Sequence, residues 1–223
     1  MDKQSFMEIV QPYSITSPKR IEALHDALEH VRVNKIEGDY VECGVFQGGN
    51  ILGIMKYLES HQSFNKNVWL YDTFEGMTAP EAVDCDLHET FAGDIWKEVQ
   101  CMASLELVKG VVSQSRFPEE KTHFIKGDVC QTLLREKNIP DSISLLRLDT
   151  DFYASTKAEL EVLWEKVSPG GVLIIDDYGH WQGCKKAVDE FFGDKVSEFT
   201  RVDYTCISLI KKNSFNPWTH TTT

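Results

Sequence analysis

Five short apolar runs are spread along the 223-residue chain, and each ends near an acidic residue. The segments between most of these runs repeat apolar residues at the spacing of an α-helix. Alternation of strand and helix patterns is typical of an α/β fold, in which helices cover both faces of a parallel sheet. We expect strands at residues 40–43, 68–72, 123–126, 143–149 and 172–176.

The predicted helices have recognisable starts and apolar faces. Ser17 and Pro18 are residues preferred at an N-cap and in the first turn of a helix. Thr156 and Glu159 have the spacing of a capping box, so a helix is expected to begin there and to end before residues 169–171, Pro-Gly-Gly. Four apolar faces are predicted: Ile21, Leu24, Leu28 and Val31; Ile51, Ile54, Met55 and Leu58; Leu160, Leu163, Trp164 and Val167; Cys184, Ala187, Val188 and Phe191.

Residues 1–223 are expected to form a single domain, with residues 1–37 as a helical segment packed on it. Residues 199–202 and 205–211 predict two further strands, which would close a seven-stranded sheet as an antiparallel hairpin. Between residues 78 and 121 the periodicity weakens, and we expect a helix at about 95–108. This segment is either a lid or insertion over a site, or an ordinary crossover connection.

The composition excludes several classes of protein. With 23 Lys and Arg against 35 Asp and Glu, the net charge is −12, and no local basic patch offers a nucleic-acid contact. No apolar stretch is long enough to span a bilayer, and the first residues lack the apolar core of a signal peptide, so we expect a cytoplasmic protein with no membrane contact. The six cysteines have no metal-binding spacing and are expected to be reduced.

A glycine-rich turn follows the first predicted strand. In open α/β sheets ligands bind beyond the carboxyl ends of the strands, where this turn lies. It reads Glu42-x-Gly44-x-x-x-Gly48-Gly49, with an acid where a dinucleotide-binding turn has its first glycine. A carboxylate there repels a pyrophosphate and suits a ligand with positive charge, such as S-adenosylmethionine. The alternative is a tight turn that needs glycine for backbone geometry alone.

Two further acids lie at the ends of the second and third predicted strands. Asp72 follows Glu42 by 30 residues, where a carboxylate can accept both hydroxyls of a ribose. Asp128 could receive the amino group of an adenine. Either residue could instead cap a turn or a helix, and Gln131 completes a capping box with Asp128.

The fourth and fifth predicted strands both end in acidic residues. Asp149 and Asp151 follow one strand, and Asp176 and Asp177 follow the next after a single crossover, which brings the two tips together. Converging carboxylates repel unless a cation lies among them, and oxygen ligands alone favour Mg²⁺ or Ca²⁺. The alternative is a set of solvated helix caps. His180 follows as a candidate base, a substrate contact or an exposed loop residue.

Five ordered segments resemble a known family, the metal-dependent O-methyltransferases of the macrocin type, which methylate sugar hydroxyls of antibiotics. The segments span most of residues 15–211 and read YVECGVFQGGN (40–50), LYDTFEGM (70–77), FIKGDVCQTL (124–133), LRLDTDFYAST (146–156) and PGGVLIIDDYGHWQGCKKAVDEF (169–191). The resemblance implies a class I S-adenosylmethionine-dependent methyltransferase fold, which is Rossmann-like, with S-adenosylmethionine as methyl donor and Mg²⁺ as cofactor. It is also compatible with a homo-oligomer formed through the N-terminal helix or the lid.

The resemblance also assigns roles to individual residues. It implies metal ligands at Asp149, Asp176 and Asp177. The donor-binding residues that it implies are Thr16, Ser17, Glu42, Gly44, Gly48, Asp72, Phe74 and Asp128.

We therefore expect methyl transfer to a hydroxyl of a small molecule, a sugar or a glycosylated metabolite, with Asp149 or His180 taking the proton. Two alternatives remain: a dinucleotide-dependent oxidoreductase on a Rossmann-like fold, and a catalytically silent module that binds S-adenosylmethionine.

Overall fold

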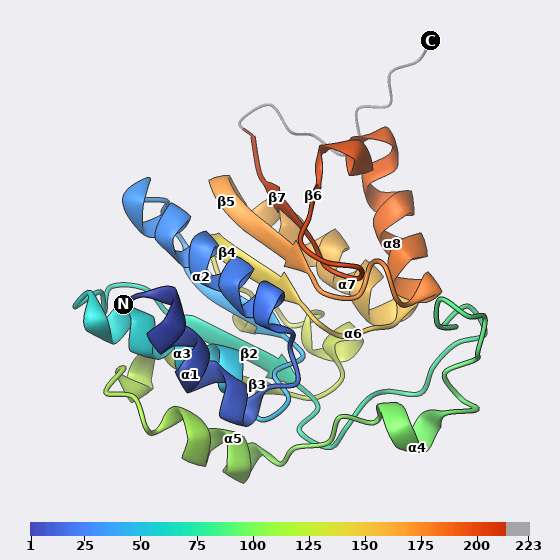
Figure 1. Cartoon of the computed structure of the whole chain (residues 1–223), viewed down its shortest axis with the longest axis horizontal. Helices are drawn as coiled ribbons and strands as arrows, with labels where there is room; N and C mark the ends of the chain where they lie inside the picture. The colour runs from blue at the N-terminus through green and yellow to red at the C-terminus, as the bar shows by residue number, and fades with distance from the viewer. Residues whose placement is uncertain (213–223) are drawn as a thin grey trace.

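A computed structural model describes residues 1–212, which form a seven-stranded sheet in the order β3-β2-β1-β4-β5-β7-β6 (Figure 1). Strands β1 to β5 are parallel, and β7 runs antiparallel to both β5 and β6. The expected mostly parallel sheet with a closing hairpin is confirmed. The strands are β1 Asp39–Cys43, β2 Val68–Asp72, β3 Thr122–Lys126, β4 Ile143–Leu148, β5 Val167–Ile175, β6 Thr200–Arg201 and β7 Ile207–Ile210.

Helices cover both faces of this sheet and enclose two apolar cores. One face carries α1 Lys3–Val10, α2 Pro18–Val33, α3 Gly49–Ser60 and α5 Leu105–Val112 (Figure 1). The other face carries α6 Val129–Thr132, α7 Tyr153–Leu163 and α8 Gln182–Phe192, with α4 Trp96–Val99 packed at its margin. Short 3₁₀ turns lie at Gln11–Tyr13, Glu119–Lys121, Glu136–Asn138, Trp164–Lys166 and Gly193–Glu198.

Strand register aligns the acidic strand ends along one edge. Leu148 pairs with both Cys43 and Ile175, so the residues that follow these strands are level with one another. The backbone ladder continues past the strands, because Asp149 N donates to Cys43 O at 2.9 Å and Asp176 N donates to Leu148 O at 2.9 Å. Backbone hydrogen bonds therefore fix where the acidic side chains begin.

The helix after β4 starts earlier than the sequence pattern suggested. It begins at Tyr153, whose N–H donates to the carboxylate of Asp84 at 2.8 Å, so the capping box expected at Thr156 and Glu159 is wrong. Glu159 is instead fully buried and accepts hydrogen bonds from the Thr150 hydroxyl. Residues 169–171 lie inside β5 rather than ending the helix, which closes in a 3₁₀ turn.

The segment 78–121 contains two helices, α4 and α5, in place of the single helix expected at 95–108. Cys101 lies in the break between them with φ +40°, a left-handed conformation that a continuous helix does not allow. Asp84 anchors this segment to the domain. Its carboxylate accepts the N–H of Tyr153 and packs against the backbone of Gly183, where an added Cβ would lie 1.8 Å from the Asp84 Oδ1 atom. Whether the segment acts as a lid stays a prediction.

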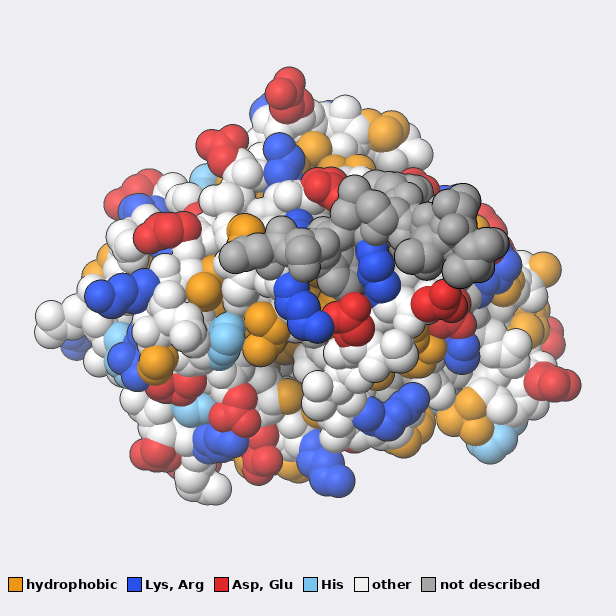
Figure 2. Space-filling model, turned by 90° about the horizontal axis from the view of Figure 1, so that it is seen from above, with side chains coloured by type: hydrophobic (Ala, Val, Ile, Leu, Met, Phe, Trp, Pro, Cys, Tyr) orange, Lys and Arg blue, Asp and Glu red, His pale blue; other side chains and the backbone are white. Residues whose placement is uncertain are grey.

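The distribution of surface charge and the state of the cysteines can be described directly from the structure. Figure 2 shows Lys and Arg side chains interspersed with Asp and Glu over the face it presents. Within residues 1–212, no helix combines the length and the apolar character that crossing a bilayer requires. All six cysteines are free thiols, and three of them are buried: Cys43, Cys184 and Cys206.

Candidate active site

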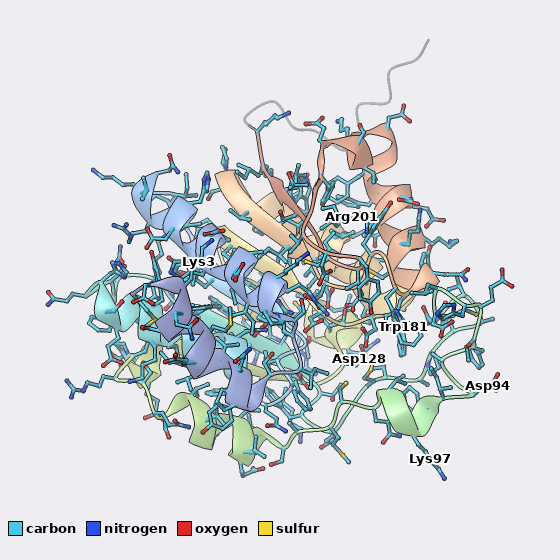
Figure 3. The ribbon with its side chains drawn as sticks, in the orientation of Figure 1. Lys3, Asp94, Lys97, Asp128, Trp181 and Arg201 are labelled. Carbon is cyan, nitrogen blue, oxygen red and sulfur yellow. The ribbon has the colours of Figure 1, made fainter. Side chains whose placement is uncertain are left out.

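A cavity of about 220 Å³ lies beyond the carboxyl ends of the parallel strands. The segment 14–16, which precedes α2, lies along one wall, and the glycine turn 44–46 lies along another. Seven of the predicted site residues line this cavity: Thr16, Gly44, Asp72, Asp128, Asp149, Asp176 and Asp177. In Figure 3, Asp128 and Trp181 lie at this edge of the sheet, whereas Lys97 on α4 points away from it.

Asp72 organises the glycine turn at the end of the cavity nearest β2. One carboxylate oxygen accepts the N–H groups of Val45 at 2.8 Å and Phe46 at 3.2 Å, and the other accepts that of Phe74 at 2.7 Å. Burial raises the pKa of Asp72, and these N–H groups oppose the rise. The turn-capping interpretation is therefore confirmed, and the carboxylate still faces the cavity, where the ribose contact stays a prediction.

Asp128 is the N-cap of α6. Its carboxylate accepts the backbone N–H of Cys130 at 2.9 Å, which satisfies a donor left free at the start of the helix. The same residue lines the cavity beside Gly127 and Val129. The capping role is confirmed, while the proposed contact with an adenine stays a prediction.

Gly44 brings the ends of β1 and β4 together. Its φ is +79°, and a Cβ at this position would lie 2.0 Å from the backbone oxygen of Asp149. Any other residue here would push Asp149, a predicted metal ligand, away from the glycine turn. The glycine therefore couples the two ends of the cavity sterically.

Arg147, which the sequence interpretation missed, lies under the acidic cluster. Its side chain is 2% exposed, and its guanidinium binds Glu42 at 2.7 Å, Asp149 at 2.8 Å and Asp176 at 2.8 Å. The available signal was a charged residue inside an otherwise apolar strand, Leu145-Leu146-Arg147-Leu148, since a buried cation requires buried anions.

Glu42 serves this buried network. Its side chain is fully buried, and one carboxylate oxygen accepts hydrogen bonds from Arg147 and from Asn50 at 3.1 Å. The other oxygen has no hydrogen-bond partner among the described residues. Glu42 is not part of the cavity wall, so its predicted contact with a donor is untested.

Asp149, Asp176 and Asp177 form a compact group of oxygen ligands. One carboxylate oxygen from each lies within 4.8 Å of the others, and the Asp149 side chain is 27% exposed while the other two residues are buried. Burial, followed by the neighbouring carboxylates, raises the pKa of Asp177 well above its usual range, and burial raises that of Asp151 to about 7. Repulsion of this kind is relieved by a cation.

The cations in place do not neutralise the cluster. Arg20 binds Asp176 and, at 3.0 Å, Asp203, and Arg147 binds the three carboxylates already named. Within residues 1–212, Asp151 and Asp177 form no ion pair, although both lie in the cavity wall. The donor set, all carboxylate oxygens with an excess of negative charge, fits Mg²⁺ or Ca²⁺.

Comparison with known proteins identifies the family. Residues 9–211 match the family model of the macrocin O-methyltransferases (TylF). The chain belongs to this family.

Curated relatives of this family member are O-methyltransferases by name. It is 33% identical over 179 residues to the demethyldecarbamoylnovobiocin O-methyltransferase of Streptomyces niveus, covering 78% of the chain and 65% of that relative's length. It is 32% identical over 194 residues to the 8-demethyl-8-(2,3-dimethoxy-alpha-L-rhamnosyl)-tetracenomycin-C 4'-O-methyltransferase of Streptomyces olivaceus, covering 83% of the chain and 72% of the relative. The chain thus spans just under two thirds of the first relative.

Solved structures of methyltransferases show the same fold. The O-methyltransferase NovP superposes with a TM-score of 0.78 at 28% identity, covering 90% of the chain and 82% of NovP. The calicheamicin methyltransferase CalS11 superposes with a TM-score of 0.68 at 17% identity, covering 93% and 90%. The expected class I S-adenosylmethionine-dependent methyltransferase fold is therefore confirmed.

Four predicted site residues of this family member lie outside the walls of the main cavity besides Glu42: Ser17, Gly48, Phe74 and His180. Ser17 caps α2 and donates to Asp203 at 2.8 Å, and Gly48 precedes α3 with φ +85°. Phe74 is buried, with its N–H held by Asp72. The predicted roles of Ser17, Gly48 and Phe74 in donor binding are untested.

His180 lines a second cavity, which adjoins the first at the acidic cluster. Burial lowers its pKa, so the imidazole is neutral at neutral pH and can accept a proton. Its Nδ1 has no hydrogen-bond partner among the described residues. The exposed-loop alternative is therefore wrong, because the side chain is half-buried at a cavity wall.

Proposed function

We propose that this chain is a metal-dependent O-methyltransferase that transfers a methyl group from S-adenosylmethionine to a hydroxyl of a sugar or a glycosylated small molecule. Family membership and the names of the curated relatives support the reaction and the class of acceptor. The observation that carries the proposal is the position of Asp149, Asp176 and Asp177 at one end of a cavity whose other end holds Asp72 and Asp128.

The donor would lie along this cavity. Asp72 and Asp128 offer carboxylates to the ribose hydroxyls and the adenine amino group, because both face the cavity while their other contacts are to backbone N–H groups. The sulfonium would lie near Gly44 and Asp149, where the net negative charge favours a cation. Thr16, on the segment before α2, would cover the donor.

Asp149, Asp176 and Asp177 would hold the metal ion. A bound Mg²⁺ lowers the pKa of an acceptor hydroxyl and fixes its position. Arg147 keeps Asp149 and Asp176 in place from below through hydrogen bonds at 2.8 Å. Asp149, or His180 from the second cavity, would take the proton as the hydroxyl oxygen bonds to the methyl carbon from the side opposite the sulfur; the carbon–sulfur bond breaks and S-adenosylhomocysteine leaves.

A direct assay tests this proposal. The protein is incubated with S-adenosylmethionine labelled in the methyl group, Mg²⁺ and a panel of glycosides, phenols and other hydroxyl compounds, and products are detected by mass spectrometry. We expect a methylated glycoside, and loss of product when EDTA removes the metal. Product formation that EDTA leaves unchanged contradicts the metal requirement. Binding of NAD without binding of S-adenosylmethionine contradicts the proposed reaction and favours an oxidoreductase.

A further inference from the structure

The second cavity shares a wall with the first. Arg20, Cys101, Asp151 and Asp177 line both cavities. If the donor occupies the first cavity, as the proposed function requires, an acceptor must reach the same carboxylates from the other side. The second cavity is that side, and it is walled by aromatic residues, His180, Trp181 and Tyr204.

Tyr204 is the exposed member of this wall. The residue is 60% exposed, although it lines the cavity, and its hydroxyl makes no hydrogen bond to residues 1–212. The ring meets that of His180 edge to face, with centroids 6.1 Å apart and an interplanar angle of 88°. Trp181 lies beneath, 5% exposed and packed edge to face on both His180 and Phe152. An open aromatic face beside a cavity is a surface for binding a ligand.

The turn that carries Tyr204 is held firmly against the acidic cluster. Asp203 accepts the N–H groups of Thr205 at 3.0 Å and Cys206 at 2.9 Å, and its other oxygen binds Ser17 at 2.8 Å and Arg20 at 3.0 Å. The Thr205 hydroxyl donates to the backbone oxygen of Asp176 at 2.8 Å. The position of the Tyr204 backbone is thus fixed relative to a proposed metal ligand.

Gly179 adds a second restraint on this turn. Its N–H donates to the backbone oxygen of Thr205 at 2.8 Å, and a Cβ on Gly179 would lie 2.0 Å from the backbone oxygen of Tyr204. The chain after Asp177 and the β6–β7 turn therefore pack backbone against backbone. A binding surface on such a support is preorganised, which favours a specific orientation of the ligand.

We propose that Tyr204, with His180 at its edge, is the platform on which one pyranose ring of the acceptor stacks. A pyranose has an apolar C–H face, which suits an aromatic ring, and a rim of hydroxyls, which suits Asp151 and Asp177 across the cavity. Tyr204 is then a specificity-determining residue for the acceptor and has no role in binding the donor. This inference rests on the proposed function, because it takes the acceptor to be a sugar.

Saturation-transfer NMR tests the platform without requiring turnover. The full chain is mixed with Mg²⁺, S-adenosylhomocysteine and methyl α-L-rhamnopyranoside, and the signal transferred to the ring protons of the sugar is measured. Tyr204→Ala should weaken binding of this probe about tenfold, whereas Tyr204→Phe should stay within about twofold of the wild type, because the ring face and not the hydroxyl makes the contact. Ile210→Ala is the matched control, an exposed apolar side chain on the same hairpin that lines neither cavity.

The outcomes separate this inference from the proposed function. Equal binding by wild type and Tyr204→Ala, or no saturation transfer from the wild type to the sugar, overturns the platform even if methyl transfer is observed. Binding that depends on Tyr204 without any methylated product supports the platform and contradicts the proposed reaction. With an active acceptor, Tyr204→Ala should raise the acceptor KM about tenfold and leave kcat and the donor Kd within about twofold.

Discussion

The two ends of the main cavity use carboxylates in different ways. At the proposed donor end, the carboxylates of Asp72 and Asp128 accept hydrogen bonds from backbone N–H groups of the turns that they cap. At the other end, Asp149 and Asp176 are bound by the guanidinium of Arg147, whereas the carboxylate of Asp177 accepts the N–H of Asp151 at 3.2 Å and has no ion pair within residues 1–212. The donor end is electrostatically complete, whereas the acidic end has more negative charge than its cations neutralise.

This difference indicates what each end binds. Carboxylates whose turns are already fixed can accept hydrogen bonds from a neutral group, such as a hydroxyl, without rearrangement. Carboxylates that repel each other in a buried site favour binding of a cation, and they lower the stability of the fold when no cation is bound. Substitutions at the two ends should therefore affect different ligands.

The largest effect is expected at Asp149. Asp149→Asn removes a proposed metal ligand and a proposed base, and should lower kcat by about a thousandfold or more while changing the donor Kd by less than about threefold. Steady-state kinetics and calorimetric titration with S-adenosylmethionine measure the two quantities. The control is Asp94→Asn, the same chemical change at an exposed position away from the cavity, visible in Figure 3. Turnover retained in Asp149→Asn would contradict the proposed roles of this residue as metal ligand and base.

The next largest effect concerns the stability of the fold. Arg147→Met leaves Glu42, Asp149 and Asp176 without their shared partner, and should lower the free energy of unfolding by about 3 to 5 kcal/mol. Urea denaturation measures this change. Adding Glu42→Gln to Arg147→Met removes the most deeply buried of the three charges and should restore part of the loss. A double variant no more stable than Arg147→Met contradicts the view that Glu42 and Arg147 act as a pair.

Donor binding separates the two acids at the other end. Asp72→Asn should raise the donor Kd about tenfold. The new side chain has one acceptor oxygen fewer for the ribose. Its NH₂ group also cannot accept hydrogen bonds from the three backbone N–H groups that both carboxylate oxygens bind in the wild type. Asn is as good an N-cap as Asp, so Asp128→Asn should keep α6 intact, and any rise in the donor Kd then reports contact with the ligand. An unchanged donor Kd in Asp128→Asn contradicts contact with the donor and means that Asp128 serves only as the N-cap of α6. Neither variant should change metal affinity.

The sequence predicted the sheet and the acidic edge because both depend on local patterns. Buried strands are apolar runs, and parallel register brings their acidic ends together, as Asp149 and Asp176 demonstrate. Long-range contacts were not predictable in this way. The N–H of Tyr153 is capped by Asp84, 69 residues away, so the local Thr156 and Glu159 pattern pointed to the wrong helix start.

Arg147 shows the same limit at the site itself. Its charge was visible in the strand, but its three partners come from three different strand ends, and which of them it would reach depends on register. Likewise, nothing local indicated that Tyr204 would lie beside His180, because the β6–β7 turn is placed there by Asp203 and Thr205.

The smallest predicted effect tests the charge excess directly. Asp177→Asn removes a buried carboxylate that faces Asp151 and Asp176, so the metal-free protein should become more stable by about 1 kcal/mol, even though a proposed ligand is lost. In the wild type, added Mg²⁺ should raise the melting temperature, because it binds the folded state, and this rise should be absent in Asp177→Asn. Thermal unfolding with Mg²⁺ and with EDTA, alongside Asp94→Asn, measures both effects. A metal-free Asp177→Asn protein that is less stable than the wild type means that the cluster is already neutralised by Arg20 and Arg147, and the two ends of the cavity then do not differ in the way described.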